Sequence, residues 1–354
     1  DYEWDKPQYD DGAAERYSRS HQSAKLDFDP GSEYNYSNPA FDILCDVISK
    51  VSGMTFENYM KTYIFEPVGM KNSTFFKPDV PEELATTPHV FGDSLNRVVS
   101  EIYPYNRRHA GSSTLHSNVE DMLLWARVNL NKGIIGGKRI YNESSYDLLT
   151  THQTTSNEDN GRKIGLSWFL SSFNENKIVF HQGGDTGYNT FFAFIPEQKS
   201  AIAIMANADR FWSNHTSRTI IVNSIFNDSA IAKAPIHMKL KDYILTEGID
   251  KVKEIYLAEQ QKSPQVYSFD DGGYIDELGY WLMDRNHLEK ALDVFNLNVE
   301  LYPEYSGWPD SVGDVYREMD SIDLAIKWYK KALELDPDQD FSIEKLNELL
   351  KSNP

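Results

Sequence analysis

Hydrophobic positions repeat with a helical period in the first part of the chain and with strand-like runs farther on. Residues 38–53 carry apolar side chains three to four positions apart, and Gly53 follows the last of them. The spacing predicts a helix that begins at Asn38 and Pro39, because asparagine caps helix starts and proline suits the first turn. The expected apolar face consists of Phe41, Leu44, Val47, Ile48 and Val51.

The same period predicts three more helices before residue 152. One covers residues 55–65 and stops at the sequence Pro67-Val68-Gly69-Met70. The next begins after Ser117 or Asn118, either of which can cap it. A short helix is expected over residues 144–151.

From Lys163 onward the pattern becomes that of strands. The predicted strands cover residues 164–170, 177–181, 190–195 and 201–206. Short strands joined by short polar turns indicate antiparallel pairing. A helix over residues 217–226 is expected to cover one face of the sheet. The first 230 residues therefore predict an α+β domain, with helices first and an antiparallel sheet after them.

The C-terminal part repeats itself with a fixed period of 34 residues. Small residues recur where two helices must approach closely, and each unit ends at a proline. This is the pattern of tetratricopeptide repeats, and a polar helix over residues 341–350 is expected to cap the stack. Such a stack either binds a peptide or protein in its groove or acts as a structural buttress. The matched pairs are Leu278/Val312, Gly279/Gly313, Leu282/Tyr316, Ala291/Ala325, Phe295/Tyr329, Asn298/Ala332 and Pro303/Pro337.

Composition narrows the possible partners. The 354 residues carry a net charge of −19, which argues against a nucleic-acid partner because phosphate binding needs a basic surface. No run is long and apolar enough to span a bilayer. The single cysteine, Cys45, is expected to be a buried small hydrophobic residue. Ligand spacings typical of metal sites are missing, so we expect no metal and no cofactor.

Two stretches are candidates for chemistry. Tyr36-Ser37-Asn38 precedes the predicted helix of residues 38–53, which would hold the Tyr36 phenol at the mouth of a rigid element. His181-Gln182-Gly183-Gly184 follows an apolar strand, and its glycines would let backbone N–H groups approach a ligand. The alternatives are a loop tyrosine that only packs its ring and a structural histidine.

The order and spacing of several motifs resemble the class C β-lactamase / penicillin-binding-protein-like serine hydrolase family. The motifs are Tyr36-Ser37-Asn38, Pro67-Val68-Gly69-Met70, Ala110-Gly111-Ser112-Ser113 leading to Glu120-Asp121-Met122, Gly165-Leu166-Ser167-Trp168 and His181-Gln182-Gly183-Gly184. The resemblance covers about residues 1–230, and relatives of this kind with C-terminal tetratricopeptide repeats are known.

The resemblance implies acyl transfer, in which a serine attacks a carbonyl while a tyrosine and a lysine move the proton. Tyr36 matches the acid/base tyrosine and Asn38 the asparagine that contacts substrate. A free phenol titrates near ~10, so Tyr36 would need nearby cations to act as a base at neutral pH.

The strand motif of the family also has a counterpart here. His181 matches the electrostatic partner of the tyrosine, and Gln182 and Gly183 match residues that bind substrate. Gly184 matches the residue whose backbone N–H donates to the oxyanion hole.

The nucleophile has no match. The family carries it in Ser-x-x-Lys upstream of the tyrosine, whereas Ser23-Ala24-Lys25 is one residue too short. The only Ser-x-x-Lys, Ser342-Ile343-Glu344-Lys345, follows the repeats, and we interpret it as chance. The resemblance therefore implies an N-terminally truncated sequence that would be inactive as given.

These observations predict three parts: a partial hydrolase domain over residues 1–230, a connector over 231–271, and tetratricopeptide repeats with a capping helix over 272–354. The expected function is that of a periplasmic or otherwise extracytoplasmic serine hydrolase acting on a D-amino-acyl peptide, a β-lactam or a small ester. The alternative is a non-catalytic binding protein that uses the repeats to hold a protein partner.

Overall fold

The computed structural model describes residues 2–91, 97–155, 162–173, 175–209, 225, 233–263 and 266–352. The chain divides into two compact units. The first is formed by Asp1–Asn214 with Ile221–Asp228, and the second by His215–Ile220 with Ser229–Pro354. The helix expected over residues 217–226 lies outside the described residues apart from Ile225.

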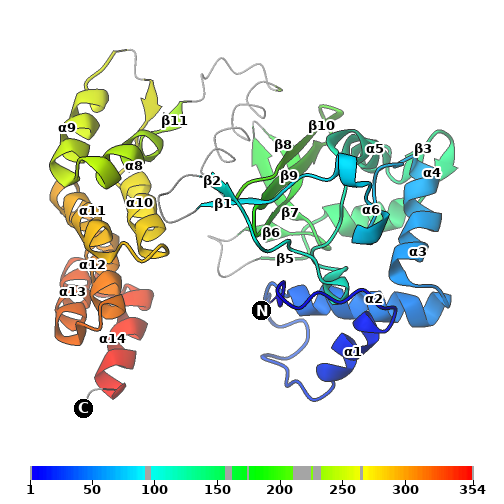
Figure 1. Ribbon diagram of the computed structural model, residues 1–354, viewed down its shortest axis with the longest axis horizontal. Helices are drawn as coiled ribbons and strands as arrows, with labels where there is room; N and C mark the ends of the chain where they lie inside the picture. The colour runs from blue at the N-terminus through cyan, green and yellow to red at the C-terminus, as the bar shows by residue number, and fades with distance from the viewer. Residues whose placement is uncertain are drawn as a thin grey trace. The chain divides into compact units, whose positions relative to one another are not determined.

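The first unit begins with helices that alternate with loops (Figure 1). The helix that follows Tyr36 is present, but its N-cap is Ser37 and not Asn38, because the Ser37 hydroxyl accepts a hydrogen bond from the Ala40 N–H at 3.2 Å. Asn118 caps its helix as expected, accepting from the Asp121 N–H at 2.9 Å. The helices are α1 (Ala13–Ser20), α2 (Asn38–Ser52), α3 (Phe56–Met60), the π-turn η1 (Lys61–Phe65), α4 (Glu66–Val68), α5 (Val119–Leu130) and α6 (Glu143–Thr150), with short 3₁₀ turns η2 (Lys77–Asp79), η3 (Glu82–Leu84) and η4 (Arg107–His109).

Helix α2 buries a different face from the one that the apolar spacing predicts. Its buried residues are Asp42, Cys45 and Asp46, which confirms the interpretation of Cys45. Four of the five predicted residues instead point outward, with exposed fractions of 41% at Phe41, 49% at Leu44, 45% at Val47 and 85% at Val51, whereas Ile48 is partly buried and packs near Cys45. Of the two buried aspartates, Asp42 binds His109 and the Ser112 N–H of another segment, and Asp46 pairs with Lys50 of the same helix.

A six-stranded sheet forms the centre of the first unit, in the order β10-β9-β8-β7-β6-β5 (Figure 1). Every neighbouring pair in it is antiparallel, as predicted. The strands are β5 (Thr154–Thr155), β6 (Lys163–Ile164), β7 (Phe169–Phe173), β8 (Asn176–Asp185), β9 (Tyr188–Ile195) and β10 (Ser200–Ala206); two small hairpins pair β1 (His89–Phe91) with β2 (Arg97–Val99) and β3 (Ile134–Ile135) with β4 (Lys138–Arg139).

Two strand boundaries differ from the prediction. The single strand expected over residues 164–170 is two strands, because the chain turns at Ser167, whose φ is 71°. Gly165 lies directly against the Leu149 carbonyl, and a Cβ there would stand 2.2 Å from that oxygen. Strand β8 runs on past His181, so the histidine lies within the strand and not at its end.

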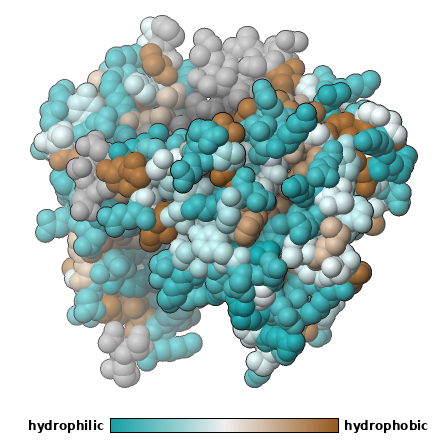
Figure 2. Space-filling model, turned by 45° about the vertical axis from the view of Figure 1, so that its right-hand side comes forward, coloured by the Kyte–Doolittle hydropathy of each residue, from teal (hydrophilic) through white to brown (hydrophobic). Residues whose placement is uncertain are grey.

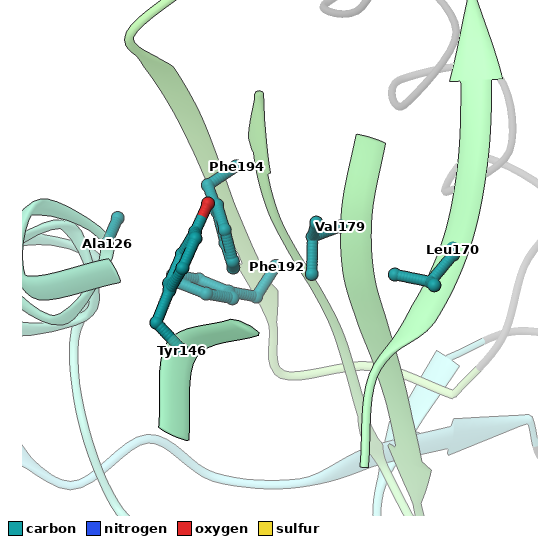
Figure 3. Packing of buried hydrophobic residues seen from close by; sticks show 6 residues of the cluster. All are labelled: Ala126, Tyr146, Leu170, Val179, Phe192 and Phe194. Atoms are coloured by element: carbon teal, nitrogen blue, oxygen red, sulfur yellow. The ribbon is translucent and has the colours of Figure 1, made fainter. Parts of the chain in front are cut away.

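Both faces of the sheet carry hydrophobic clusters. On one face, side chains of α5 and α6 pack on side chains of β7, β8 and β9 (Figure 3). That cluster consists of Ala126, Tyr146, Leu170, Val179, Phe192 and Phe194. The other face is built around Phe180, Phe191 and Ile195, with Ile225 packed against them. On the molecular face drawn in Figure 2, hydrophobic residues form separate small patches among hydrophilic ones.

The second unit is helical and contains the predicted repeats. The pairs α10/α11 and α12/α13 are the two repeat units, and α14 packs on α13 as the expected final helix. The segment expected to be a connector holds α8 and α9, which pack on each other and on α10 and α11. The elements are β11 (Ala234–Pro235), α8 (His237–Thr246), α9 (Ile249–Gln260), β12 (Tyr267–Ser268), α10 (Gly273–Met283), α11 (Leu288–Leu301), α12 (Gly307–Glu318), α13 (Ile322–Leu335) and α14 (Asp340–Ser352).

The 34-residue period is explained by close helix contacts. A Cβ on Gly279 would stand 2.2 Å from the Phe295 ring, and one on Gly313 would stand 2.6 Å from the Tyr329 ring. Each glycine thus lets the second helix of its repeat approach the first. The fold is therefore the predicted combination of a β-lactamase/transpeptidase-like α+β domain and tetratricopeptide helices.

Candidate active site

The predicted site residues meet in one cleft of the first unit, with a volume of about 1420 Å³. Its lining includes Tyr36, Asn38 and all four residues of the stretch His181–Gly184. Asn38 is the first residue of α2 and Tyr36 lies two positions before it, and the others come from β8. Two segments separated by about 145 positions in the sequence are thus brought together.

Tyr36 is half-exposed and its ring faces aromatic neighbours. The ring centroid lies 6.2 Å from that of His181 and 6.4 Å from that of Phe169. Partial burial raises the pKa of the Tyr36 phenol above its ordinary value of 10.0. The phenol therefore keeps its proton at neutral pH in this environment, so that it can donate a proton.

The rings of His181, Tyr36 and Phe169 form a triangle. The His181 ring stacks on Phe169, with centroids 4.8 Å apart and planes 14° apart. Burial lowers the pKa of His181 below its ordinary value of 6.5. The imidazole is consequently neutral at pH 7 and supplies no positive charge that would help Tyr36 to ionise.

Strand β8 presents one backbone edge to the cleft. It pairs with β7 only as far as Phe180, whereas with β9 it pairs through Asp185. Asp185 and Tyr188 flank a two-residue turn, so they form a hydrogen-bonded pair, and backbone direction alternates along an antiparallel strand. The Gly184 N–H and C=O therefore point away from β9, on the side where β7 has ended. We call this the cleft-facing edge of β8.

Sequence reasoning missed several residues beside this edge. The Ser113 hydroxyl donates to the Asp185 carboxylate, which also accepts from the Trp4 indole N–H. The Tyr2 hydroxyl donates to Ser112 Oγ at 2.9 Å. Ser112 and Ser113 belong to a motif that carried the family resemblance, but nothing in the sequence indicated that they meet the end of β8.

The only Ser-x-x-Lys of the sequence has a structural explanation in the second unit. Ser342 is fully buried and donates to the Asp310 carboxylate at 2.5 Å. Lys345 binds Asp310 at 2.5 Å and Asp314 at 2.6 Å. Both side chains connect α14 to α12, and the buried serine is inaccessible to a substrate.

Neither a metal cluster nor a membrane-spanning helix is found within the part of the chain that the structure describes. The search for metal sites covered groups of three or more His, Cys, Asp or Glu side chains. No helix there has the length and apolar character that crossing a bilayer requires.

Curated proteins share sequence with about half of this chain. D-alanyl-D-alanine-carboxypeptidase/endopeptidase AmpH of Escherichia coli (strain K12) is 26% identical over 187 residues, covering 50% of this chain and 46% of that protein. Protein flp of Staphylococcus aureus (strain MW2) is 25% identical over 190 residues, covering 54% of this chain and 36% of that protein. The chain thus matches half or less of the length of these curated relatives.

Solved structures show the same fold. D-amino acid amidase from Ochrobactrum anthropi SV3 complexed with L-phenylalanine amide has a TM-score of 0.52 at 15% identity, covering 65% of this chain and 70% of that one. The penicillin binding protein from Bacillus halodurans has a TM-score of 0.50 at 20% identity, covering 59% and 62%.

Family profiles match both units. The profile of the TPR repeat matches residues 313–340, which lie within the predicted repeats. That of the β-lactamase family matches residues 1–223, which contain the whole cleft and both predicted motifs. The chain therefore belongs to the β-lactamase family.

Proposed function

We propose that this chain supplies the acid/base tyrosine and the oxyanion strand of a serine hydrolase that works by acyl transfer. The observation that carries the proposal is that Tyr36 and the cleft-facing edge of β8 line the same cleft. The substrate class is a D-amino-acyl peptide, a β-lactam or a small ester, in keeping with relatives named D-alanyl-D-alanine carboxypeptidase. The place of action is the periplasm or another extracytoplasmic space.

The cleft-facing edge of β8 supplies the electrostatic part of the reaction. An N–H aimed at the position of a developing oxyanion stabilises the tetrahedral intermediate more than the planar substrate. The Gly184 N–H points to that side, and Gly184 is itself exposed in the cleft. A substrate backbone laid along this edge would place its carbonyl beside the Gly184 N–H, as strand addition does at sheet edges.

Tyr36 supplies the proton for the leaving group. The phenol is protonated at neutral pH and so has a proton to give, and Asn38, the first residue of α2, holds the substrate beside it. To serve as a base as well, the phenol needs a cation beside it, and the neutral His181 is not that cation. The lysine of a Ser-x-x-Lys motif would supply the charge, together with the serine nucleophile.

The experiment uses the natural protein that contains this chain. The Tyr36→Phe variant removes only a hydroxyl and is expected to lower kcat for a chromogenic D-alanyl ester by about 10²-fold or more, as loss of a general acid/base does. Retention of full acyl-transfer activity by this variant would show that the role given to Tyr36 is wrong. Leu257→Ala, on α9 of the second unit, is the matched surface control and should keep kcat.

The Gly184 N–H is tested by a pair of variants. Gly184→Pro removes the N–H that points away from β9 and keeps the β8–β9 ladder, because edge positions tolerate proline. Gly184→Ala keeps the N–H and serves as the control for added volume. We expect the proline variant to lose about 10²–10³-fold in kcat and the alanine variant much less. Equal losses would contradict the assignment.

A second candidate function is that of a binding protein without catalysis. The TPR match favours it. The intact mass of the natural protein separates the two proposals. A mass equal to the 40.7 kDa of this chain favours the binding protein. A mass higher by roughly 10 kDa or more, the size of a domain, favours the hydrolase, and a serine that reacts with a β-lactam would then identify the nucleophile.

A further inference from the structure

The end of strand β8 is tied to two distant segments through one side chain. Asp185 is the last residue of β8 and directly follows Gly184. Its carboxylate accepts hydrogen bonds from the Ser113 hydroxyl and from the Trp4 indole N–H. Burial raises the pKa of Asp185, and these two donors act in the opposite direction by stabilising the carboxylate.

Residues 110–113 lie directly on helix α2. The Ser112 N–H donates to Asp42 Oδ1 at 3.0 Å, and Asp42 is fully buried one turn after Asn38. Gly111 touches the helix backbone, since a Cβ there would stand 2.2 Å from the Phe41 carbonyl oxygen. The segment therefore follows any movement of the start of α2.

The Asp42 carboxylate is itself fixed. Its Oδ2 lies 2.7 Å from His109 Nδ1, and Arg108 Nε donates to His109 Nε2 at 2.9 Å. Nε2 is thus the acceptor and Nδ1 carries the proton that Asp42 accepts. The rings of Tyr2 and Trp4 meet His109 edge-on, with centroids 4.7 and 5.6 Å away. A satisfied buried network of this kind permits little displacement.

We propose that Asp185 is a positioning residue that holds the Gly184 N–H at a fixed place relative to Tyr36, through Ser113 and the segment 110–113 that rests on α2. The inference rests on the proposed acyl-transfer function. Oxyanion donors must lie within 2.7–3.1 Å of the developing charge, and a misplacement of about 1 Å can cost about 10²-fold in rate. Asp185 lines the same cleft, and in this role it acts through the adjacent peptide group.

Kinetics of the natural protein test this role with three variants. Ser113→Ala and Asp185→Asn are each expected to lower kcat about 10- to 100-fold while KM stays within about twofold, because the interaction is made only in the transition state. The affinity for a boronic acid that forms a tetrahedral adduct should fall in parallel with kcat. The double variant should lose about as much as Asp185→Asn alone, since Ser113 acts through its hydrogen bond to Asp185.

Asp121→Asn is the matched control. Asp121 is also a buried carboxylate that accepts from a backbone N–H and a serine hydroxyl, those of Asn72 at 2.7 Å and Ser73 at 2.8 Å. Asn72 and Ser73 line the cleft but make no hydrogen bond to β8 among the described residues. The variant should therefore cost stability and leave the ratio of boronic acid affinity to substrate affinity unchanged.

The outcomes separate this inference from the function on which it rests. Unchanged kcat in an active natural protein, or a fall in kcat with no fall in boronic acid affinity, overturns the role of Asp185 alone. A natural protein that neither hydrolyses the ester nor is acylated overturns both proposals. If Asp185→Asn folds poorly, hydrogen exchange in Ser113→Ala tests the inference instead. The amides of residues 183–186 should exchange faster than in the unaltered protein, and unchanged exchange rates refute the inference.

Discussion

Gly111→Ala should loosen the contact on which the site geometry depends. Gly111 lies where the chain crosses α2, and an added Cβ would stand 2.2 Å from the Phe41 carbonyl oxygen, 2.7 Å from its carbon and 2.8 Å from Cys45 Sγ. Gly111 has no positive φ, so alanine is compatible with its backbone conformation and the clash alone decides the outcome. Because two of the three atoms belong to a helix backbone, a rotamer change cannot relieve it.

The magnitude follows from overpacking in other cores, which typically costs 1–3 kcal/mol. Because the added Cβ of Gly111→Ala meets backbone atoms, we expect a loss of about 3 kcal/mol in the free energy of unfolding, at the upper end of this range. For a domain of this size, about 1 kcal/mol lowers Tm by roughly 2–4 °C, so a fall of about 6–12 °C is expected. Cys45→Ala in the same molecule should restore only a small part, since it relieves only the sulfur contact.

Differential scanning calorimetry of the chain measures Tm, and hydrogen exchange shows whether the amides of α2 lose protection. Gly12→Ala is the matched control, because an added Cβ there meets mainly the tips of the flexible Arg16 and Asp10 side chains. Its Tm should change by less than about 2 °C. An equal Tm for Gly111→Ala and the unaltered chain would refute the argument that this segment rests on α2.

Three further predictions concern stability. Gly279→Ala should lower the free energy of urea unfolding of the helical unit by about 1–2 kcal/mol, because the clash with the Phe295 ring outweighs the higher helix propensity of alanine. In a double-mutant cycle, Phe295→Leu should reduce this cost by making room for the added methyl group. Burial raises the pKa of Asp276 from 3.8 to about 7, so the native state keeps a proton that the unfolded chain releases. The free energy of unfolding should therefore fall as the pH rises from 3.8 to about 7. In Asp276→Asn, the free energy of unfolding should differ less between about pH 5 and about pH 8 than it does in the unaltered chain. Arg107→Met should cost about 3 kcal/mol in thermal or urea unfolding, because it leaves the Glu57 carboxylate, 2.7 Å from Arg107 Nε, without its buried partner.

The periodicity of apolar residues predicted most helices and strands. It failed where contacts between residues far apart in the sequence determine which face is buried or where a strand ends. The 34-residue period of the repeats was visible because it reflects contacts between helices adjacent in sequence, such as Gly313 on Tyr329. The buried side of α2 could not be predicted, because it depends on Asp42 meeting His109 and Ser112 some 70 positions away. The break at Ser167 likewise follows from a contact of Gly165 with Leu149, which the apolar run 164–170 does not reveal.

The candidate site likewise contains residues that the sequence predicted and residues that it did not. Tyr36 and the stretch His181–Gly184 could be predicted, since each stands in a short motif beside a regular element. Asp185 and Ser113 could not, because their hydrogen bond joins residues 72 positions apart and neither type is unusual in a turn. The neutral state of His181 also escaped prediction, as it follows from burial against Phe169.

The outward row of apolar side chains on α2 has a consequence for how this chain behaves in solution. The charge of −19 repels neighbouring molecules, and that repulsion reaches about 30 Å at 0.01 M salt but only about 8 Å at 0.15 M. Phe41, Leu44, Val47 and Val51 attract one another only at contact. Added salt should therefore let α2 surfaces meet, and light scattering of the isolated chain should rise with ionic strength.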